Sequence, residues 1–572
     1  MPADTTVSPA KKQALTVPAS DASSGADSYL LTQARAVHRI YGPLYADKPI
    51  RVILKSRDHA WGTPHEVTVV QGNPGLDAVD ENYLGAVTFD PLDAPRGKTR
   101  GRIGSSGDED GKDEITIIAP IPCQIRPGES VPEKTTPDFQ HHPVLGRLMW
   151  NAPVLFEQGK YRIESRQKLV RREKHSFEPV KRAAVQHIGG ELLEQWDTTR
   201  PPTILIGFHW LEPGGAEKLA FDSVKWARQA GLRVLVVAER SEIHRLQSKL
   251  PDDPQVEFIR ADAYLDPKRW FEFLKALIKR ENIRALHIHH NTRLYDNLLR
   301  LKAVFPDLVT IDSTHIVEHE NGGFPRTSGV WTRYIDHHHV ISRELMSFYL
   351  DEFGVSDRVM LGRMLDPDGT EGPTPDPELR LQAGQKTCRL IFIGRMVHQK
   401  RAPLAVAILR GLHRRAKKLG VEFHLDMVGT GTYLDVVRNM ISRAGLSGYV
   451  TLHPADSDVP ALLQKADILL LPSANEGLAL VCYEAIENGV IPISTDVGGQ
   501  SELVADQLLV PVSPLACVRD SVRLVSRLLS DSDFLQECKS ETIARYRSLR
   551  TDPTASQVLG ALYRDIAKSA EK

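Results

Sequence analysis

The feature that most constrains the fold is an alternation of short apolar runs with amphipathic helical stretches, which occurs twice along the chain. The first series occupies residues 201–365 and contains the runs TILIGFHW, LRVLVVAE, VEFIRA, ALHIHH and LVTIDST. The second occupies residues 380–545 and contains CRLIFIGR, FHLDMVG, YVTLHP, DILLLPS and VIPISTD. Continuous apolar strands separated by helices are typical of βαβ units in parallel sheets. We therefore predict an α/β protein with two Rossmann-like, doubly wound domains, joined by the Pro/Gly/Asp-rich linker 366–379.

Ligands of open parallel sheets bind beyond the carboxyl ends of the strands. Two such domains that face each other predict a site in the cleft between them. Residues in the loops after the predicted strands are therefore the first candidates for function.

The remaining segments differ in composition from the two α/β series. Residues 1–27 are rich in Ala, Ser, Thr, Pro and Asp without periodicity and are predicted to be disordered. Within 28–139, short β-prone runs between Gly/Pro/Asp-rich breaks predict a small antiparallel, β-rich accessory module. Residues 140–200 are predicted to form a basic helical connector, and 546–572 a C-terminal helix that returns to the first α/β domain.

Composition is that of an ordinary soluble globular protein. The chain has 572 residues, of which 41% are hydrophobic and 25% charged, with a net charge of -1. This length predicts two or three domains, and the near-neutral balance gives no reason to expect nucleic-acid binding. No apolar run approaches the roughly 18 residues that span a bilayer, and the first residues lack the apolar core of a signal peptide. The five cysteines are scattered and never form a C-x-x-C pair, so we expect a cytoplasmic protein without a disulfide framework.

The stretch NEGLALVCYEA places a carboxylate at each end of an apolar run. Glu476 is predicted to lie just before a helix and Glu484 about two turns along it, roughly 12 Å apart along the axis. The free N–H groups of Gly477, Leu478 and Ala479 at the helix start could bind an anion. The alternative is an ordinary acidic residue at a helix N-terminus followed by a surface glutamate.

This stretch resembles the E-x7-E signature of retaining glycosyltransferases of family 4, which have the GT-B fold of two Rossmann-like domains facing a cleft. The resemblance covers about residues 201–572. GRMVHQKRAP resembles the loop of that family that holds the donor diphosphate, which implies this role for Arg395 and Lys400 and a donor-binding role for Gly394. MVGTGTY resembles the family's Gly-x-Gly turn near the nucleotide, with Gly429 and Gly431 in the matching positions.

Further motifs resemble the same family in the expected order. EPGGAEKL resembles its Gly-Gly loop, where Gly214 and Gly215 would let the backbone approach phosphate. STHIVEH resembles the Thr-His at a strand end, which implies a polar role for His315 near the reacting sugar. IDHHHVISREL resembles the last strand and helix of the first domain, with Ser342 in the matching position. STDVGGQSELV resembles the loop and short helix after the E-x7-E helix.

The resemblance implies metal-independent transfer of a sugar from a nucleotide-diphosphate sugar, with retention at the anomeric carbon and no cofactor. Arg395 and Lys400 would stabilise the departing diphosphate, because fixed cations are needed where charge develops. Glu476 would position the donor sugar, and Glu484 the ribose. No convincing carboxylate nucleophile is present, which favours front-face attack by the acceptor, expected to be a glycan or a lipid-linked saccharide.

Two positions depart from the family pattern. Ala479 replaces a glycine, which could narrow the sugar or phosphate pocket, and the strand ending MLGRMLDPDG replaces a frequent Asn-Gly, which puts that contact in doubt. Two alternatives stay open: a catalytically silent GT-B partner or regulatory subunit, and a nucleotide-sugar epimerase. The charged residues of the signature argue against a silent subunit, since such a copy has no need of them.

Three other signals favour structural interpretations. The histidine clusters at 141–142, 289–290 and 337–339 have no acidic partner spaced to complete a metal site. The acidic run 108–110 lies in a Gly/Ser-rich loop, so a solvated loop is favoured over a metal motif. The basic stretch 160–182 could contact an anionic membrane surface or a lipid-diphosphate acceptor, but a solvated helix face is the commoner reason for such a run.

Overall fold

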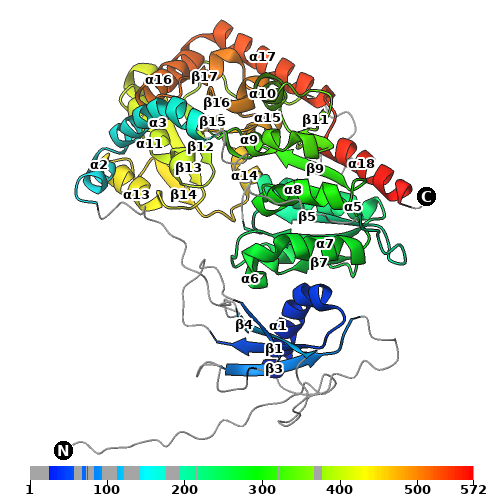
Figure 1. The fold of residues 1–572 in the computed structure, drawn as a ribbon. Helices are drawn as coiled ribbons and strands as arrows, with labels where there is room; N and C mark the ends of the chain where they lie inside the picture. The colour runs from blue at the N-terminus through cyan, green and yellow to red at the C-terminus, as the bar shows by residue number, and fades with distance from the viewer. Residues whose placement is uncertain are drawn as a thin grey trace, which may run out of the picture. The chain divides into compact units, whose positions relative to one another are not determined.

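The computed structural model contains a four-stranded, a seven-stranded and a six-stranded sheet (Figure 1). The chain divides into two compact units, each described here by itself. The first comprises Met1–Glu129, Ile188–Val309 and Ile566–Lys572, and the second Ser130–His187 and Thr310–Asp565. The structure describes residues 25–56, 67–72, 74, 83–92, 113–121, 142–175, 193–212, 215–318, 322–365 and 376–570. The predictions for 1–24, for the acidic run 108–110 and for most of the linker 366–379 lie outside these ranges.

The N-terminal sheet of the first unit is mixed rather than antiparallel. Its strands are β1 (Ile50–Lys55), β2 (Thr68–Gln71), β3 (Tyr83–Phe89) and β4 (Ile115–Pro120), in the order β2-β4-β1-β3. β1 pairs antiparallel with β3 but parallel with β4. The prediction of a β-rich module is confirmed, while the prediction that it is antiparallel is wrong. Parallel pairing needs a long crossover, and the chain between β1 and β4 supplies one.

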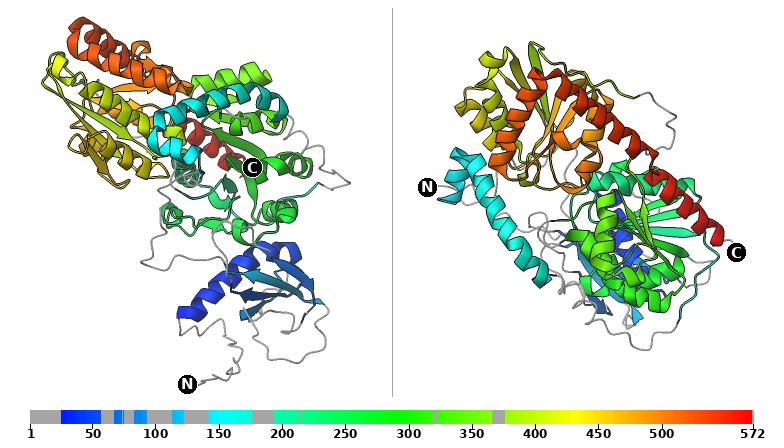
Figure 2. Two further views of the ribbon diagram at one scale, coloured as in Figure 1. Left: turned by 90° about the vertical axis from the view of Figure 1, so that its left-hand side faces the viewer. Right: turned by 90° about the horizontal axis from the view of Figure 1, so that it is seen from above.

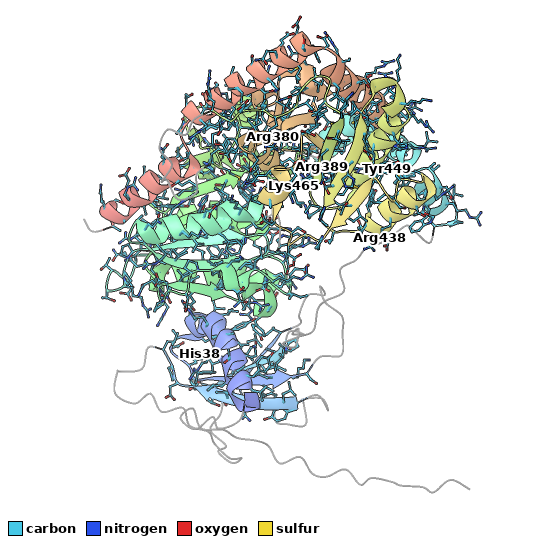
Figure 3. All side chains as sticks on the ribbon, turned by 180° about the vertical axis from the view of Figure 1, so that it is seen from behind. His38, Arg380, Arg389, Arg438, Tyr449 and Lys465 are labelled. Carbon is cyan, nitrogen blue, oxygen red and sulfur yellow. The ribbon has the colours of Figure 1, made fainter. Side chains whose placement is uncertain are left out.

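A helix that the sequence analysis did not expect, α1 (Gly25–Tyr41), packs on β1 and β3. Its buried face consists of Ala34, Val37, Ile40 and Tyr41, at helical spacing. His38 stacks on Phe89 of β3 with ring centroids 4.2 Å apart (Figure 3). Burial, together with the neighbouring Arg39, lowers the pKa of His38 to about 4. The helix therefore covers one face of the sheet, and the imidazole of His38 at this contact is neutral at pH 7.

A cluster of ion pairs joins α1 to the parallel strands of the first unit. The Arg39 guanidinium lies 2.7 Å from Glu257 Oε1 and 2.8 Å from Glu281 Oε1. Glu281 also pairs with Arg233 and, at 3.1 Å, with Arg200. Burial alone would raise the pKa of Glu281, but Arg39, Arg233 and Arg200 lower it below its ordinary value. The charge of Glu281 therefore stabilises the folded unit.

We expect Glu281→Gln to lower the free energy of unfolding by about 3 kcal/mol at pH 7, because it leaves three arginines without their shared carboxylate. A depressed folded-state pKa gives stability above the unfolded value of about 4.3, and this is lost as the pH falls through the folded value. Urea unfolding should therefore show a larger difference between variant and wild type at pH 7 than at pH 3. Glu272→Gln, at an exposed carboxylate 3.7 Å from Arg300, is the control. An equal loss at both pH values would contradict this role.

The seven-stranded sheet has the order β11-β10-β9-β8-β5-β6-β7. Its strand order reverses between β5 and β8, as in a doubly wound sheet. The strand pairs β5–β6, β5–β8, β6–β7, β9–β10 and β10–β11 are parallel. The strands are β5 (Thr203–Phe208), β6 (Arg233–Ala238), β7 (Val256–Ile259), β8 (Ile283–His289), β9 (Val309–Thr314), β10 (His337–Val340) and β11 (Val359–Leu361). The main helices are α5 (Gly215–Gln229), α7 (Trp270–Arg280), α8 (Thr292–Val304), α9 (Gly323–Val330) and α10 (Arg343–Phe353).

The six-stranded sheet of the second unit is parallel throughout and has the order β14-β13-β12-β15-β16-β17. Its order reverses between β12 and β15, which are neighbours. The strands are β12 (Thr387–Ile393), β13 (Glu422–Val428), β14 (Val450–His453), β15 (Ile468–Leu471), β16 (Ile491–Thr495) and β17 (Leu509–Val510). The main helices are α11 (Ala402–His413), α13 (Leu434–Arg443), α15 (Leu480–Glu487), α16 (Pro514–Ser530), α17 (Ser532–Thr551) and α18 (Ala555–Ser569).

The predicted fold class is confirmed: two doubly wound parallel sheets follow a small β-rich sheet. Every apolar run quoted above coincides with a strand, give or take one or two residues at either end. The central strands are buried on both faces, while the edge strands β7 and β14 are only partly buried. The Arg380 guanidinium, labelled in Figure 3, donates to the carbonyls of Leu463 and Ala466, which lie just before the amino end of β15.

Within the connector 140–200, two helices, α2 (Leu145–Asn151) and α3 (Pro153–His175), lie in the second unit, whereas residues 193–200 are not helical and belong to the first unit. α3 packs on α11 and α16 (Figures 1 and 2). At the C-terminus the predicted boundary at 546 falls inside α17, and the return of the C-terminal helix to the first α/β domain stays a prediction. The chain turns at Pro553, where the Pro553 carbonyl accepts from the Arg363 N–H at 2.9 Å, and α18 begins from there.

Candidate functional site

The loops after β12 and β15 meet at the point where the strand order of the six-stranded sheet reverses. Lys400, in the β12 loop, donates from Nζ to Glu476 Oε1 of the β15 loop at 2.6 Å. The two side chains are 18% and 8% exposed, so the pair is largely shielded from water. Two side chains that the sequence assigned to diphosphate and sugar therefore lie in direct contact.

Backbone hydrogen bonds hold these two loops in register. The Ala474 N–H donates to the Gln399 carbonyl at 2.7 Å, and the Gln399 amide donates to the Asn475 carbonyl at 3.1 Å. The Asn475 amide in turn donates to the Val317 carbonyl at 3.0 Å. The residues on either side of Lys400 and Glu476 are therefore fixed to each other and to the segment after β9.

The Gly-x-Gly turn after β13 packs against the first residues of the β12 loop. Gly429 and Gly431 have φ values of 127° and 138°. A Cβ at Gly429 would lie 2.2 Å from the Gly394 carbonyl oxygen, and one at Gly431 would lie 2.8 Å from that of Met396. Only glycine satisfies both the backbone angle and the contact. The two glycines therefore support the loop that carries Arg395 and Lys400.

The backbone of Gly477 contacts His315, the residue that follows β9. The backbone of Gly498 packs against the loop after β15, which contains Gly477. A Cβ at Gly477 would lie 1.8 Å from the His315 carbonyl oxygen, and one at Gly498 would lie 2.0 Å from that of Glu476. The Gly499 N–H donates to the Gly477 carbonyl at 2.8 Å. The structure thus brings His315, which is buried, to the residue that follows Glu476.

Gln500 is a site residue that the sequence analysis missed. It is fully buried, its Oε1 accepts from the Ala479 N–H at 2.9 Å, and its Nε2 donates to Ser494 Oγ at 3.0 Å. The expectation that the Ala479 N–H is free for an anion is therefore wrong in this structure. Gln500 lies in the stretch STDVGGQSELV. It is a single amide side chain between small residues, and this pattern could have identified it as a candidate.

The other predicted residues are distributed as follows. Arg395 is exposed and, within the described ranges, forms no ion pair. Leu478 is buried, while Glu484 is half-buried in α15, on the turn after its first residues. Ser342 caps α10, since its hydroxyl accepts from the Leu345 N–H at 3.2 Å. Of the two glycines in the first unit, Gly215 begins α5 and Gly214 lies outside the described residues.

The segment MLGRMLDPDG, where the sequence departs from the family pattern, is occupied by a buried arginine. Arg363 is 1% exposed and pairs with Glu502 at 2.6 Å and Asp552 at 2.7 Å. It also donates to the Ile341 carbonyl at 3.0 Å. Arg363 therefore links the end of β11 to the loop after β16 and to the α17–α18 turn.

The buried histidines of β10 have structural partners. His338 Nδ1 lies 2.8 Å from Asp312 Oδ1, and its Nε2 lies 2.9 Å from the Thr332 hydroxyl. His339 bridges Ser313 Oγ at 2.9 Å and the Gly362 carbonyl at 3.1 Å. The acidic partner Asp312 was not found from the sequence, and these contacts favour a structural role for His338 and His339. No group of three or more metal-ligating side chains occurs in the described part of the chain.

The basic stretch 160–182 is helical as far as His175. Lys160 lies 3.7 Å from Glu164, and Arg162 and Arg166 are exposed. None of the helices in the described ranges has the length and apolar character required to cross a bilayer.

The segment that contains Lys400 and Glu476 is similar to known proteins. Residues 380–545 match the family described as glycosyl transferases group 1. The chain is 27% identical over 185 residues to a D-inositol 3-phosphate glycosyltransferase of Arthrobacter, covering 31% of this chain and 42% of that protein. It is 25% identical over 241 residues to a 2-deoxystreptamine glucosyltransferase of Streptomyces kanamyceticus, covering 40% of this chain and 59% of that protein. The chain thus spans about half the length of these relatives.

Two solved structures are also similar to this chain. One is sucrose-phosphate synthase of Thermosynechococcus elongatus, with 17% identity, a TM-score of 0.47 and coverage of 65% of this chain and 100% of the other. Another is HepE of Anabaena in complex with UDP, with 14% identity, a TM-score of 0.46 and coverage of 64% and 99%.

Proposed function

We propose that this chain is a glycosyltransferase that moves a sugar from a nucleotide-diphosphate sugar to an acceptor. The observation that carries the proposal is the shielded Lys400–Glu476 pair at the reversal point of the six-stranded sheet. Ligands bind at such a point, beyond the carboxyl ends of the strands. The pair lies inside the segment that matches glycosyl transferases group 1.

The roles of the four charged residues follow from their chemistry. Lys400 and the exposed Arg395 would bind the diphosphate and stabilise the charge that develops as it leaves. Glu476 would accept hydroxyl groups of the donor sugar, and Glu484 those of the ribose. His315 supplies a polar group beside Gly477, whose backbone it contacts. Lys400 and Glu476 neutralise each other; on donor binding, Lys400 would contact the phosphate and Glu476 the sugar.

The finer mechanism is part of the proposal. We favour transfer with retention by front-face attack, in which the leaving diphosphate oxygen accepts the proton of the acceptor, without a metal ion. The acceptor that we favour is a glycan or a lipid-linked saccharide, and the exposed arginines of α3 support a peripheral contact with an anionic surface. The names of two relatives describe transfer to hydroxyl-rich acceptors, inositol phosphate and deoxystreptamine.

Hydrolysis of nucleotide sugars tests this function. With UDP-, GDP- and ADP-sugars and no acceptor, the wild type should slowly release one nucleoside diphosphate, and Glu476→Gln should lower that rate by about 10²-fold. Glu422→Gln changes an exposed carboxylate at the first residue of β13 and should leave the rate unchanged. Release that persists undiminished in Glu476→Gln would refute the site. No release and no binding of any of these nucleotides would favour a silent regulatory subunit instead.

A further inference from the structure

Helix α3 precedes the matched family segment, yet it contacts the loop that carries Lys400. Glu157 of α3 is fully buried. Its Oε2 lies 2.9 Å from His398 Nδ1 and 3.6 Å from Arg401 Nε. Arg401 is itself only 1% exposed. A buried carboxylate is tolerated where cations neutralise it, and here the two cations flank Lys400 in sequence.

The geometry of the turn explains why these residues separate onto two sides. His398–Lys400 forms a single 3-10 turn, in which side chains three residues apart eclipse. Arg401 ends the turn in a left-handed conformation; His398 and Arg401 face Glu157, while Lys400 faces Glu476. Arg401 has a φ of 49°, a conformation that costs free energy in a non-glycine residue and must be held by its surroundings.

Further contacts anchor α3 at this position. Gln158 Oε1 accepts from Ser513 Oγ at 2.9 Å and from the Leu515 N–H at 3.0 Å, at the start of α16. Glu164, two turns along α3, lies 3.2 Å from His398 Nε2. Arg401 donates from Nη1 to the Val512 carbonyl at 2.6 Å. These contacts fix α3 to α16. Two carboxylates of α3, Glu157 and Glu164, contact the two ring nitrogens of His398.

We propose that Glu157 is a positioning residue for the donor diphosphate: it holds the His398–Lys400 turn so that Lys400 faces Glu476 and the phosphate position. This inference rests on the proposed function. Glu157 acts on the diphosphate through this turn, since its carboxylate is fully buried, contacts His398, Arg401 and Tyr433, and is not exposed. The connector helix therefore completes the donor site from outside the Rossmann-like domain that contains it.

The contacts with Glu157 and Glu164 also influence the charge state of His398. Burial alone would lower the pKa of His398, but Glu157 and Glu164 raise it above its ordinary value, against an opposing effect of Lys160. Loss of Glu157 should therefore lower this pKa. In such a variant His398 loses its proton at a lower pH than in the wild type, and its remaining pair with Glu164 then loses its ionic character.

The test is isothermal titration calorimetry with UDP, GDP and ADP at pH 6 and pH 8. We expect Glu157→Gln to weaken binding of the nucleotide that the wild type binds by about tenfold, as for supporting residues of other sites. The loss should be greater at pH 8 than at pH 6. Arg162→Gln, on the exposed face of the same helix, should match the wild type at both pH values.

The same substitution in the Lys400→Gln variant distinguishes a positioning role of Glu157 from a general effect on stability. If Glu157 acts through Lys400, adding Glu157→Gln to Lys400→Gln should change affinity by less than about twofold, because coupled residues are not additive. An undiminished tenfold effect in that background would overturn the inference. So would a Glu157→Gln protein that binds like Arg162→Gln.

Two further outcomes are misfolding of Glu157→Gln and the absence of nucleotide binding by the wild type. Should Glu157→Gln fail to fold, His398→Gln removes the same ion pair from the other side and should show the same loss and the same non-additivity; a normal affinity there would overturn the inference. If the wild type binds none of the three nucleotides, the proposed function fails and this role falls with it. If the wild type binds but Glu157→Gln has no effect, only the positioning role fails.

Discussion

Replacing Lys400 by glutamine is expected to lower the rate of sugar transfer or of nucleotide-sugar hydrolysis by about 10²–10³-fold. The reason is that the leaving diphosphate gains charge in the transition state, and a fixed cation in a water-poor site stabilises that charge strongly. Lys400 is only 18% exposed, so solvent cannot replace it efficiently. The measurement is the steady-state rate at saturating donor, with Lys465→Gln, an exposed lysine of the same unit (Figure 3), as control.

This variant also needs a control for folding. Lys400→Gln leaves the buried Glu476 without its cation, which should lower the free energy of unfolding by about 3 kcal/mol. The double variant Lys400→Gln/Glu476→Gln removes both charges and should recover most of that stability while remaining inactive. An active double variant, or a fully active Lys400→Gln, would show that the pair has no part in the reaction.

Gly498→Ala is expected to cause the second large loss, in both stability and activity. Gly498 has a φ of 57°, which costs an alanine about 1–2 kcal/mol. Its Cβ would also lie 2.0 Å from the Glu476 carbonyl oxygen, a backbone atom that can move only with the loop. We expect a total loss of roughly 3–5 kcal/mol in unfolding free energy. Displacement of Glu476 should lower the rate by about 10²-fold.

Gly420→Ala provides the matched control for Gly498→Ala. Gly420 has a φ of 67°, but a Cβ there would meet no atom within 4 Å. This variant should therefore show only the conformational cost of about 1–2 kcal/mol and full activity. Equal effects of the two substitutions on thermal unfolding and rate would contradict the close approach of Gly498 to Glu476.

Much of the fold and the central pair of the site could be predicted because the signals are local. The apolar runs specify strands, and the intervening helices specify parallel pairing. In a doubly wound sheet the first and fourth strands become neighbours, so the loops with Lys400 and Glu476 had to meet. The Gly-x-Gly turn at Gly429 and Gly431 was recognisable for the same reason, since its backbone angles require glycine.

The remainder depends on contacts between distant segments, which leave no periodic signal. The mixed pairing of β1 and β4 depends on how a long crossover returns, not on either strand. Gln500, Arg363 and Glu157 are polar residues whose roles appear only when their partners are known. Glu157 in particular lies in a segment that composition describes simply as basic and helical.

The proposed site requires Lys400 and Arg395 to bind a diphosphate beside Glu476. Calorimetric titration of the wild type, Lys400→Gln and Arg395→Gln with UDP, GDP and ADP measures this binding. We expect the wild type to bind one nucleoside diphosphate and each variant to bind it at least about tenfold more weakly. Equal affinity in all three proteins, or binding of none of the nucleotides by the wild type, would contradict it.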